Sequence, residues 1–295
     1  MIGYRISRHN LKRLIERQAP GWIGRAKTRT EGFEAMGKFS EPSSIWSEVK
    51  PVYMELQGDS KCVFCERKLE SVDLGKGEQA VEHFRPKGKL SSWRLPARLT
   101  KMGIAPTTPP KGKGGYYRLA YDLFNYSAAC NPCNSALKRD YFPISGTYQL
   151  AGANPESLLK ERPLLIYPIG DFDADPEKLI GFNGVSPYAA GASQKERERG
   201  LVTIEFFQLD SLKRSNLLLE RARIIETLFM ALEDLSSASS TPSRKARARS
   251  LVKQAKSHKA PHANCARSFC NLFVTDPSAA AEISAGASAF VDSKS

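Results

Sequence analysis

The sequence predicts an α+β protein. Three observations indicate this: apolar residues at helical spacing in two segments, short β-like runs in mid-chain, and two Cys-x-x-Cys pairs. With 295 residues, 41% of them hydrophobic, the chain can bury at least one core. We expect four regions in order: an N-terminal helical segment (1–60), a core that carries the chemistry (61–145), an α/β extension (146–235), and a basic linker with a largely disordered tail (236–295).

The N-terminal segment predicts helices. Residues 5–18 carry apolar side chains at helical spacing, and Pro20 with the glycine after it ends the pattern. Residues 43–57 (SSIWSEVKPVYMELQ) carry a second apolar stripe, which Pro51 should kink or divide.

The C-terminal half predicts short strands and one long helix. The runs RPLLIYPI (162–169), LIGFNG (179–184) and LVTIEFF (201–207) read as strands. Asp210 or Ser211 could cap an amphipathic helix that extends to about Leu235. Its inward side chains would be Leu217, Ile224, Leu228 and Leu232. The Ser-rich run at 236–243 resembles a linker, and the Ala/Ser-rich end from Ser278 predicts disorder.

Charge is placed unevenly along the chain. The formal net charge is +13, and residues 84–121 contain many Lys and Arg but no Asp or Glu. Such a cluster attracts a phosphate backbone, so we expect nucleic acid as a partner. A second basic run at 243–259 is equally consistent with a solvated tail. No signal peptide and no apolar run of ~20 residues is visible, so we expect a cytoplasmic protein without membrane contact.

Four cysteines predict a structural metal site. Cys62 and Cys65 form one Cys-x-x-Cys pair, and Cys130 and Cys133 form another after a long gap. Thiols stay reduced inside cells, and four thiolates are a ligand set that tetrahedral Zn²⁺ prefers. A zinc with four thiolates has no open position, so any chemistry must lie elsewhere.

A different role is expected for the last two cysteines. Cys265 and Cys270 lie in a run with helical apolar spacing, in which free cysteine is a common core residue. We expect packing there rather than a second metal site.

Candidate catalytic residues lie between the cysteine pairs. Glu82 and His83 end a short β-like run, directly before a basic cluster. Imidazole titrates near neutral pH, so His83 could act as a general base. Carboxylate and amide oxygens suit Mg²⁺, so Glu82 and an Asn side chain could bind it. In an ideal strand Glu82 and His83 would face opposite ways.

The second cysteine pair opens a predicted helix. YYRLAYDLFNYSAAC (116–130) reads as a strand with Asn125 on it, and a helix should follow from about Pro132 to Arg139. Asn134 and Lys138 are four residues apart and share a helix face, whereas Cys133 lies about 100° away. Asn134 is then free for a catalytic metal and Lys138 for phosphate.

These motifs together resemble the HNH endonucleases. CVFCE, EHFRPK, YYRLAYDLFNYSAACNPCNSALK and YFP are similar to the branch with two Cys-x-x-Cys knuckles, and to the nucleases of Septu and retron-associated anti-phage systems. The resemblance covers roughly residues 46–235. It implies a ββα-metal core with a four-cysteine zinc knuckle.

The resemblance also implies roles for single residues. His83 matches the general base and Asn125 the asparagine that orients base or substrate. Asn134 stands where many members have a final histidine, and Glu82 stands where aspartate is frequent. Mg²⁺ or Mn²⁺ at Glu82 and Asn134 would then assist hydrolysis of a phosphodiester bond in DNA, started by a water that His83 deprotonates.

The nucleic-acid contacts and partners follow from the same picture. The cations expected beside phosphates are Arg85, Lys87, Lys89, Lys138 and Arg139. The resembled group works with an ATPase of the ABC or SMC-like kind, and this chain has no phosphate-binding P-loop. Two other interpretations stay open: a non-catalytic zinc module that binds nucleic acid, and a nuclease that cleaves RNA.

Overall fold

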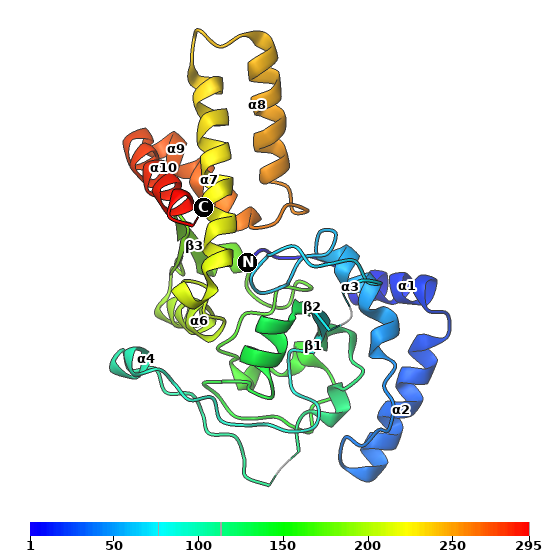
Figure 1. Cartoon of the computed structure of the whole chain (residues 1–295). Helices are drawn as coiled ribbons and strands as arrows, with labels where there is room; N and C mark the ends of the chain where they lie inside the picture. The colour runs from blue at the N-terminus through cyan, green and yellow to red at the C-terminus, as the bar shows by residue number, and fades with distance from the viewer. Residues whose placement is uncertain (76, 113, 295) are drawn as a thin grey trace.

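Helices form the N-terminal part of the molecule (Figure 1). The computed structural model describes residues 1–75, 77–112 and 114–294. The first elements are α1 (Arg8–Gln18), α2 (Trp22–Met36), the 3-10 helix η1 (Trp46–Val49) and α3 (Lys50–Leu56). Trp22 is fully buried, and its indole N–H donates to the Ile45 carbonyl at 2.9 Å. Both predicted helices are confirmed, and Pro51 lies where 3-10 geometry changes to α.

A two-stranded antiparallel sheet lies at the centre. Strand β1 (Gln79–His83) pairs with β2 (Tyr126–Cys130), with Glu82 opposite Ser127. A short π-helix, η4 (Pro132–Lys138), follows β2 directly. Asn125 was expected on the strand, but it ends the 3-10 helix η3 (Leu123–Asn125), because the Asp122 carboxylate caps that turn by accepting from the Phe124 N–H.

A long excursion joins the two strands. It contains α4 (Ala97–Lys101) and the 3-10 helix η2 (Tyr117–Leu119). Its return is fixed where Tyr116 N–H donates to the Pro86 carbonyl at 2.8 Å. A Cβ atom on Gly115 would lie only 2.1 Å from that same oxygen, so this close approach requires glycine. The excursion therefore closes against the segment that follows β1.

The extension after residue 146 differs from two predictions. It contains η5 (Pro155–Ser157), η6 (Leu159–Glu161), α5 (Pro176–Leu179), strands β3 (Ile180–Asn183) and β4 (Ser186–Ala189), and α6 (Gln194–Phe206). The LIGFNG strand is confirmed as β3. The LVTIEFF strand is wrong, because a capping box between Ser193 and Glu196 starts a helix that continues through it.

The RPLLIYPI segment is buried but is not a regular strand. Only isolated bridges form at its ends, between Ile144 and Pro163 and between Tyr4 and Ile169. Proline has no N–H for a ladder, and this run contains Pro163 and Pro168.

Four helices complete the chain. They are α7 (Ser215–Ser236), after the 3-10 turn η7 (Leu212–Arg214), then α8 (Pro242–Ala255), α9 (Ala263–Thr275) and α10 (Pro277–Asp292). Figure 1 shows α7 and α8 as an antiparallel hairpin that projects from the body. The expected cap of the long helix is wrong, because Ser211 caps the 3-10 turn η7 and α7 starts after Arg214 without a side-chain cap. Ile225 rather than Ile224 is fully buried on α7.

The expectation of a disordered tail is wrong. Asp276 accepts a hydrogen bond from the Ala279 N–H and starts α10, with Pro277 at its first position. Alanine has the highest helix propensity, so the Ala-rich composition favours this helix. Ala280 and Ala287 are buried against the rest of the molecule.

The described part of the chain is therefore an α+β protein with mixed helices and two small sheets. Most of its buried apolar residues form one connected cluster from Met1 to Ala287. Among the helices that the structure describes, none has the length and apolar character needed to cross a bilayer.

Candidate metal centre and adjoining cavity

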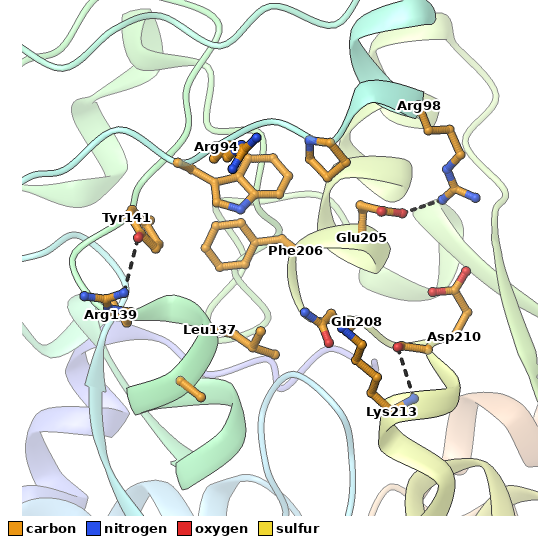
Figure 2. A pocket seen from close by; sticks show the side chains of 14 residues that line it. Arg94, Arg98, Leu137, Arg139, Tyr141, Glu205, Phe206, Gln208, Asp210 and Lys213 are labelled. Carbon is orange, nitrogen blue, oxygen red and sulfur yellow. Dashed lines mark hydrogen bonds and ion pairs between the residues drawn. The ribbon is translucent and has the colours of Figure 1, made fainter.

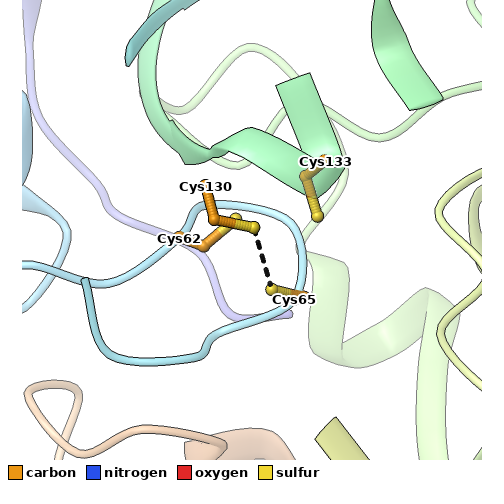
Figure 3. Close-up of side chains that lie close together, drawn as sticks. All are labelled: Cys62, Cys65, Cys130 and Cys133. Carbon is orange, nitrogen blue, oxygen red and sulfur yellow. Dashed lines mark hydrogen bonds between the residues drawn. The ribbon is translucent and has the colours of Figure 1, made fainter. Parts of the chain in front are cut away.

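The four predicted zinc ligands lie together. Cys62 and Cys65 stand on a tight turn, Cys130 ends β2, and Cys133 is in the first turn of η4 (Figure 3). All four side chains are buried, and their sulfur atoms lie within 4.8 Å of one another. The Val63 N–H donates to the Ala128 carbonyl at 3.1 Å, which fixes the turn against β2. We call these four residues the cysteine cluster.

The geometry of the cysteine cluster fits zinc. The Sγ atoms of Cys65 and Cys130 are 3.8 Å apart. Ligands at ~2.3 Å around a tetrahedral ion would be separated by ~3.8 Å. Among the described residues, no other group of three or more Cys, His, Asp or Glu side chains has the geometry to hold a metal. The cluster could therefore hold a zinc ion.

Two residues that sequence reasoning missed support the cluster. Both terminal nitrogens of Arg214 lie 3.6 Å from the Cys133 sulfur, and one also donates to the Phe207 carbonyl at 2.7 Å. Burial alone would lower the Arg214 pKa, but the thiolates, Cys133 foremost, raise it overall. The buried Gln57 amide donates to the carbonyls of Lys61 and Ala128 and accepts from the Ala128 N–H. No local spacing signals either residue.

A cavity of about 460 Å³ is lined by η4 residue Asn134 and by Arg139 and Asp140, which follow the helix. Its lining brings together six of the predicted site residues: Glu82, His83, Lys87, Lys89, Asn134 and Arg139. We call it the histidine cavity. Glu82 and His83 both reach it, because His83 is the last residue of β1 and the chain turns immediately afterwards.

His83 is held in a fixed orientation. Its Nε2 lies 3.1 Å from the Ala120 carbonyl oxygen, which can only accept. Nε2 therefore carries the proton, and Nδ1 keeps a lone pair in the neutral ring. The rings of Trp46 and Tyr126 pack edge-on against the imidazole, with centroids 4.9 and 5.0 Å away. Burial, and then the charge of Lys87, hold the His83 pKa well below its usual value.

Glu82 is buried beside a lysine. Lys138 Nζ lies 3.1 Å from Glu82 Oε1, and both side chains are almost fully buried. Burial raises the pKa of Glu82 to about 7, although Lys138 opposes the shift. The contact is an ion pair without hydrogen-bond alignment, so Oε1 accepts no hydrogen bond within the described part of the chain.

The cavity contains oxygen ligands of the kind that a hard cation prefers. Glu82 offers a buried carboxylate oxygen that lacks a hydrogen-bond donor, and Asn134 lines the same cavity. Asp140, which sequence reasoning missed, adds a carboxylate that accepts from the Ser91 hydroxyl at 2.7 Å. The only cue to Asp140 in the sequence is its place one residue after the basic pair that ends the helix.

Two predicted site residues are built into the scaffold instead. Asn125 is fully buried, and its amide bonds to backbone atoms of Arg85 and Leu119. Arg85 is buried too, and its Nε donates to Glu161 at 2.8 Å. Neither residue lines the histidine cavity.

The remaining predicted cations divide into two kinds. Lys138 is fully buried against Glu82, so it is not exposed to a phosphate chain. Lys87 lies over the Trp46 ring, 4.4 Å from its centroid, and lines the cavity. Lys89 and Arg139 are exposed at the cavity, with Lys89 Nζ 3.6 Å from Asp140.

Cys265 and Cys270 are buried in α9, as the helical spacing predicts. The Cys265 thiol donates to the Gly184 carbonyl at 3.4 Å, and both cysteines belong to the apolar core.

Comparison with known proteins finds a similar sequence. Over 172 residues the chain is 28% identical to the Septu protein PtuB of Bacillus mycoides (strain KBAB4). The matched segment covers 58% of this chain and 48% of that protein. The chain therefore spans about half the length of this curated relative. No family model and no solved structure matches the chain. Over the matched segment, the chain is similar to a Septu PtuB protein.

Proposed function

We propose that the chain is a metal-dependent endonuclease of the HNH type that hydrolyses phosphodiester bonds in DNA. The observation that carries the proposal is the fixed His83 ring at the edge of a basic cavity. The order of two antiparallel strands and a short helix, with a cysteine cluster at the helix start, agrees with a ββα-metal core.

His83 is the proposed general base. Its Nε2 proton is held by the Ala120 carbonyl, so Nδ1 can take a proton from a water molecule in the cavity. Trp46 and Tyr126 prevent the ring from turning. Asn125 acts indirectly, because its amide holds the backbone of Arg85 two residues after His83.

Glu82 and Asn134 are the proposed holders of a Mg²⁺ or Mn²⁺ ion. Such an ion would stabilise the negative charge that develops on the leaving oxygen. Lys87, Lys89 and Arg139 are the proposed phosphate contacts, because they line the cavity. Arg85 and Lys138 are left out of these contacts since both are buried in ion pairs.

We also propose that the protein belongs to an anti-phage defence system and acts with an ABC- or SMC-like ATPase. The similarity to Septu protein PtuB supports this. Most leucines of α7 are buried, whereas Leu212 in η7 and Met230 in α7 are exposed. Co-expression with the neighbouring ATPase should give a complex with increased activity. Full activity without nucleotide, from a protein that migrates alone, would contradict the partner proposal.

Cleavage of supercoiled plasmid tests the central proposal. The wild-type protein with Mg²⁺ should produce nicked or linear DNA, and His83→Ala should lower the rate by ~10²–10⁴, as expected on loss of a general base. His9→Ala changes an exposed histidine on α1 and is the matched control.

Three outcomes would change the assignment. Equal cleavage by His83→Ala and wild type would move the active site elsewhere. DNA binding without cleavage by any variant would favour the non-catalytic zinc module. Cleavage of a matched RNA and not of DNA would favour the RNA nuclease.

A further inference from the structure

A second cavity adjoins the histidine cavity. Its volume is about 660 Å³, and it lies between the segment before α4, the end of η4 and the end of α6 (Figure 2). Arg139 lines both cavities. We call the second one the tryptophan cavity, after Trp93. Arg139 therefore lies where the two cavities meet.

The tryptophan cavity has an aromatic wall. The Trp93 and Phe206 rings pack with centroids 4.9 Å apart, and Tyr141 meets Phe206 edge-on at 6.4 Å. Phe206 is buried and supports the half-buried Trp93 from below. Trp93 thus presents a partly exposed indole on a rigid base, which suits stacking with another planar ring.

The cavity also carries excess positive charge. Its cations are Arg94, Arg98, Arg139 and Lys213, and its acids are Glu205 and Asp210. Arg98 and Glu205 neutralise each other through an ion pair of 2.6 Å. Within the described parts of the chain, no carboxylate lies at ion-pair distance from the exposed Arg94 or Lys213. Two exposed cations are therefore available to an anionic ligand.

Arg139 is placed to bridge the two cavities. It follows η4 with φ 47° and ψ −130°, a backbone conformation that is unusual for a residue with a side chain. Its N–H donates to the Asn134 carbonyl at 2.7 Å, which fixes this turn. Its guanidinium lies 5.5 Å from the Tyr141 ring centroid, toward the tryptophan cavity (Figure 2).

We propose that the tryptophan cavity binds unpaired nucleotides that flank the scissile phosphate. A base stacks on Trp93, and the phosphates beside it contact Arg94 and Lys213. In a duplex the base faces are covered by neighbouring bases, so an aromatic wall selects a single-stranded segment. The inference rests on the proposed function, which places the scissile phosphate in the histidine cavity.

Binding measured without cleavage tests the proposal. The probe is a fluorescein-labelled single-stranded DNA 12-mer, compared with the same sequence as a duplex, in buffer without added divalent cation. The variants are Trp93→Ala, Trp93→Phe and the double change Arg94→Glu with Lys213→Glu. Arg13→Glu changes an exposed cation on α1, which Figure 1 shows on the other side of the molecule from α4.

The single strand should bind roughly tenfold more weakly to Trp93→Ala, because one stacked base is lost, and Trp93→Phe should keep most of the affinity. The double charge variant should lower the slope of log affinity against log salt by about 1.4, since two phosphate contacts are removed. Duplex binding should change much less in Trp93→Ala.

Two results would overturn the proposal. In the first, Trp93→Ala and the double variant bind the single strand as tightly as the control Arg13→Glu does. The other is an equal loss of single-strand and duplex binding. Failure of the nuclease proposal is a separate result: the wild type would cut no DNA, yet the same variants would still lose single-strand binding. Normal cleavage with unchanged binding would overturn only the tryptophan cavity.

Discussion

The cysteine cluster and the histidine cavity both involve helix η4, through Cys133 and Asn134, and they differ in how their polar groups are satisfied. The four sulfurs are buried, close together and supported by Arg214 and Gln57. In the cavity, Glu82 Oε1 accepts no hydrogen bond from the residues that the structure describes, and Lys89 and Arg139 are exposed. The cysteine cluster needs only one metal ion to satisfy its ligands. The histidine cavity has the space and the exposed charges to bind a larger ligand.

Loss of one cysteine ligand should have the largest effect, because it removes both zinc binding and folding. Cys62→Ser or Cys130→Ser removes a thiolate from a site whose zinc affinity, ~10–16 kcal/mol in small domains, is also folding free energy. We expect insoluble or unfolded protein, with bound zinc falling from one equivalent to none by metal analysis. Cys270→Ala, in the buried α9, should retain zinc. Soluble wild-type protein without zinc would contradict the prediction.

Substitutions of Arg85 and Lys89 should have different effects, the first on stability and the second on DNA binding. Arg85→Met leaves the Glu161 carboxylate buried and unpaired, which should lower the free energy of unfolding by ~3–5 kcal/mol in denaturant titration. Lys89→Met changes an exposed side chain and should leave stability unchanged. It should instead lower the salt slope of duplex binding by about 0.9, as for one lost phosphate contact. Equal stability of the two variants would show that the buried pair is not supporting the fold.

Arg214 should give a smaller effect that is confined to the metal. Arg214→Gln removes the positive charge beside the Cys133 sulfur, and loss of such a supporting partner typically costs ~10–100-fold in metal affinity. Competition with a chromophoric zinc chelator measures the change. Arg223→Gln, an exposed position on the following helix α7, is the control. Equal zinc affinity in the two variants would assign Arg214 to packing alone.

The sequence predicted the cysteine cluster well because its information is local. Each Cys-x-x-Cys pair fits one turn, and the turn geometry brings both sulfurs to the same side. The β1 strand with Glu82 and His83 was equally local. The error at LVTIEFF had the same character, since the capping box at Ser193 was present in the sequence and outweighed the β propensity of the run after it.

The rest depended on partners far along the chain. Nothing near Arg85 announces Glu161, 76 residues later, so a buried ion pair looked like a phosphate contact. Lys138 was misassigned for the same reason. Its partner Glu82 lies far away in the sequence, and the buried ion pair between them removes Lys138 from the surface. The sequence shows where Lys and Arg residues are, but only the fold shows which of them reach the surface.

The turn that carries Cys62 and Cys65 is also held by residues near position 260. Lys61 Nζ donates to the Ala260 carbonyl at 2.8 Å, and the His262 N–H donates to the Glu66 carbonyl at 3.3 Å. These contacts join parts of the chain almost 200 residues apart, so the turn cannot reach its final packing until that late segment has left the ribosome. During synthesis, the half-finished chain would expose the reduced thiols of Cys62 and Cys65 for many seconds.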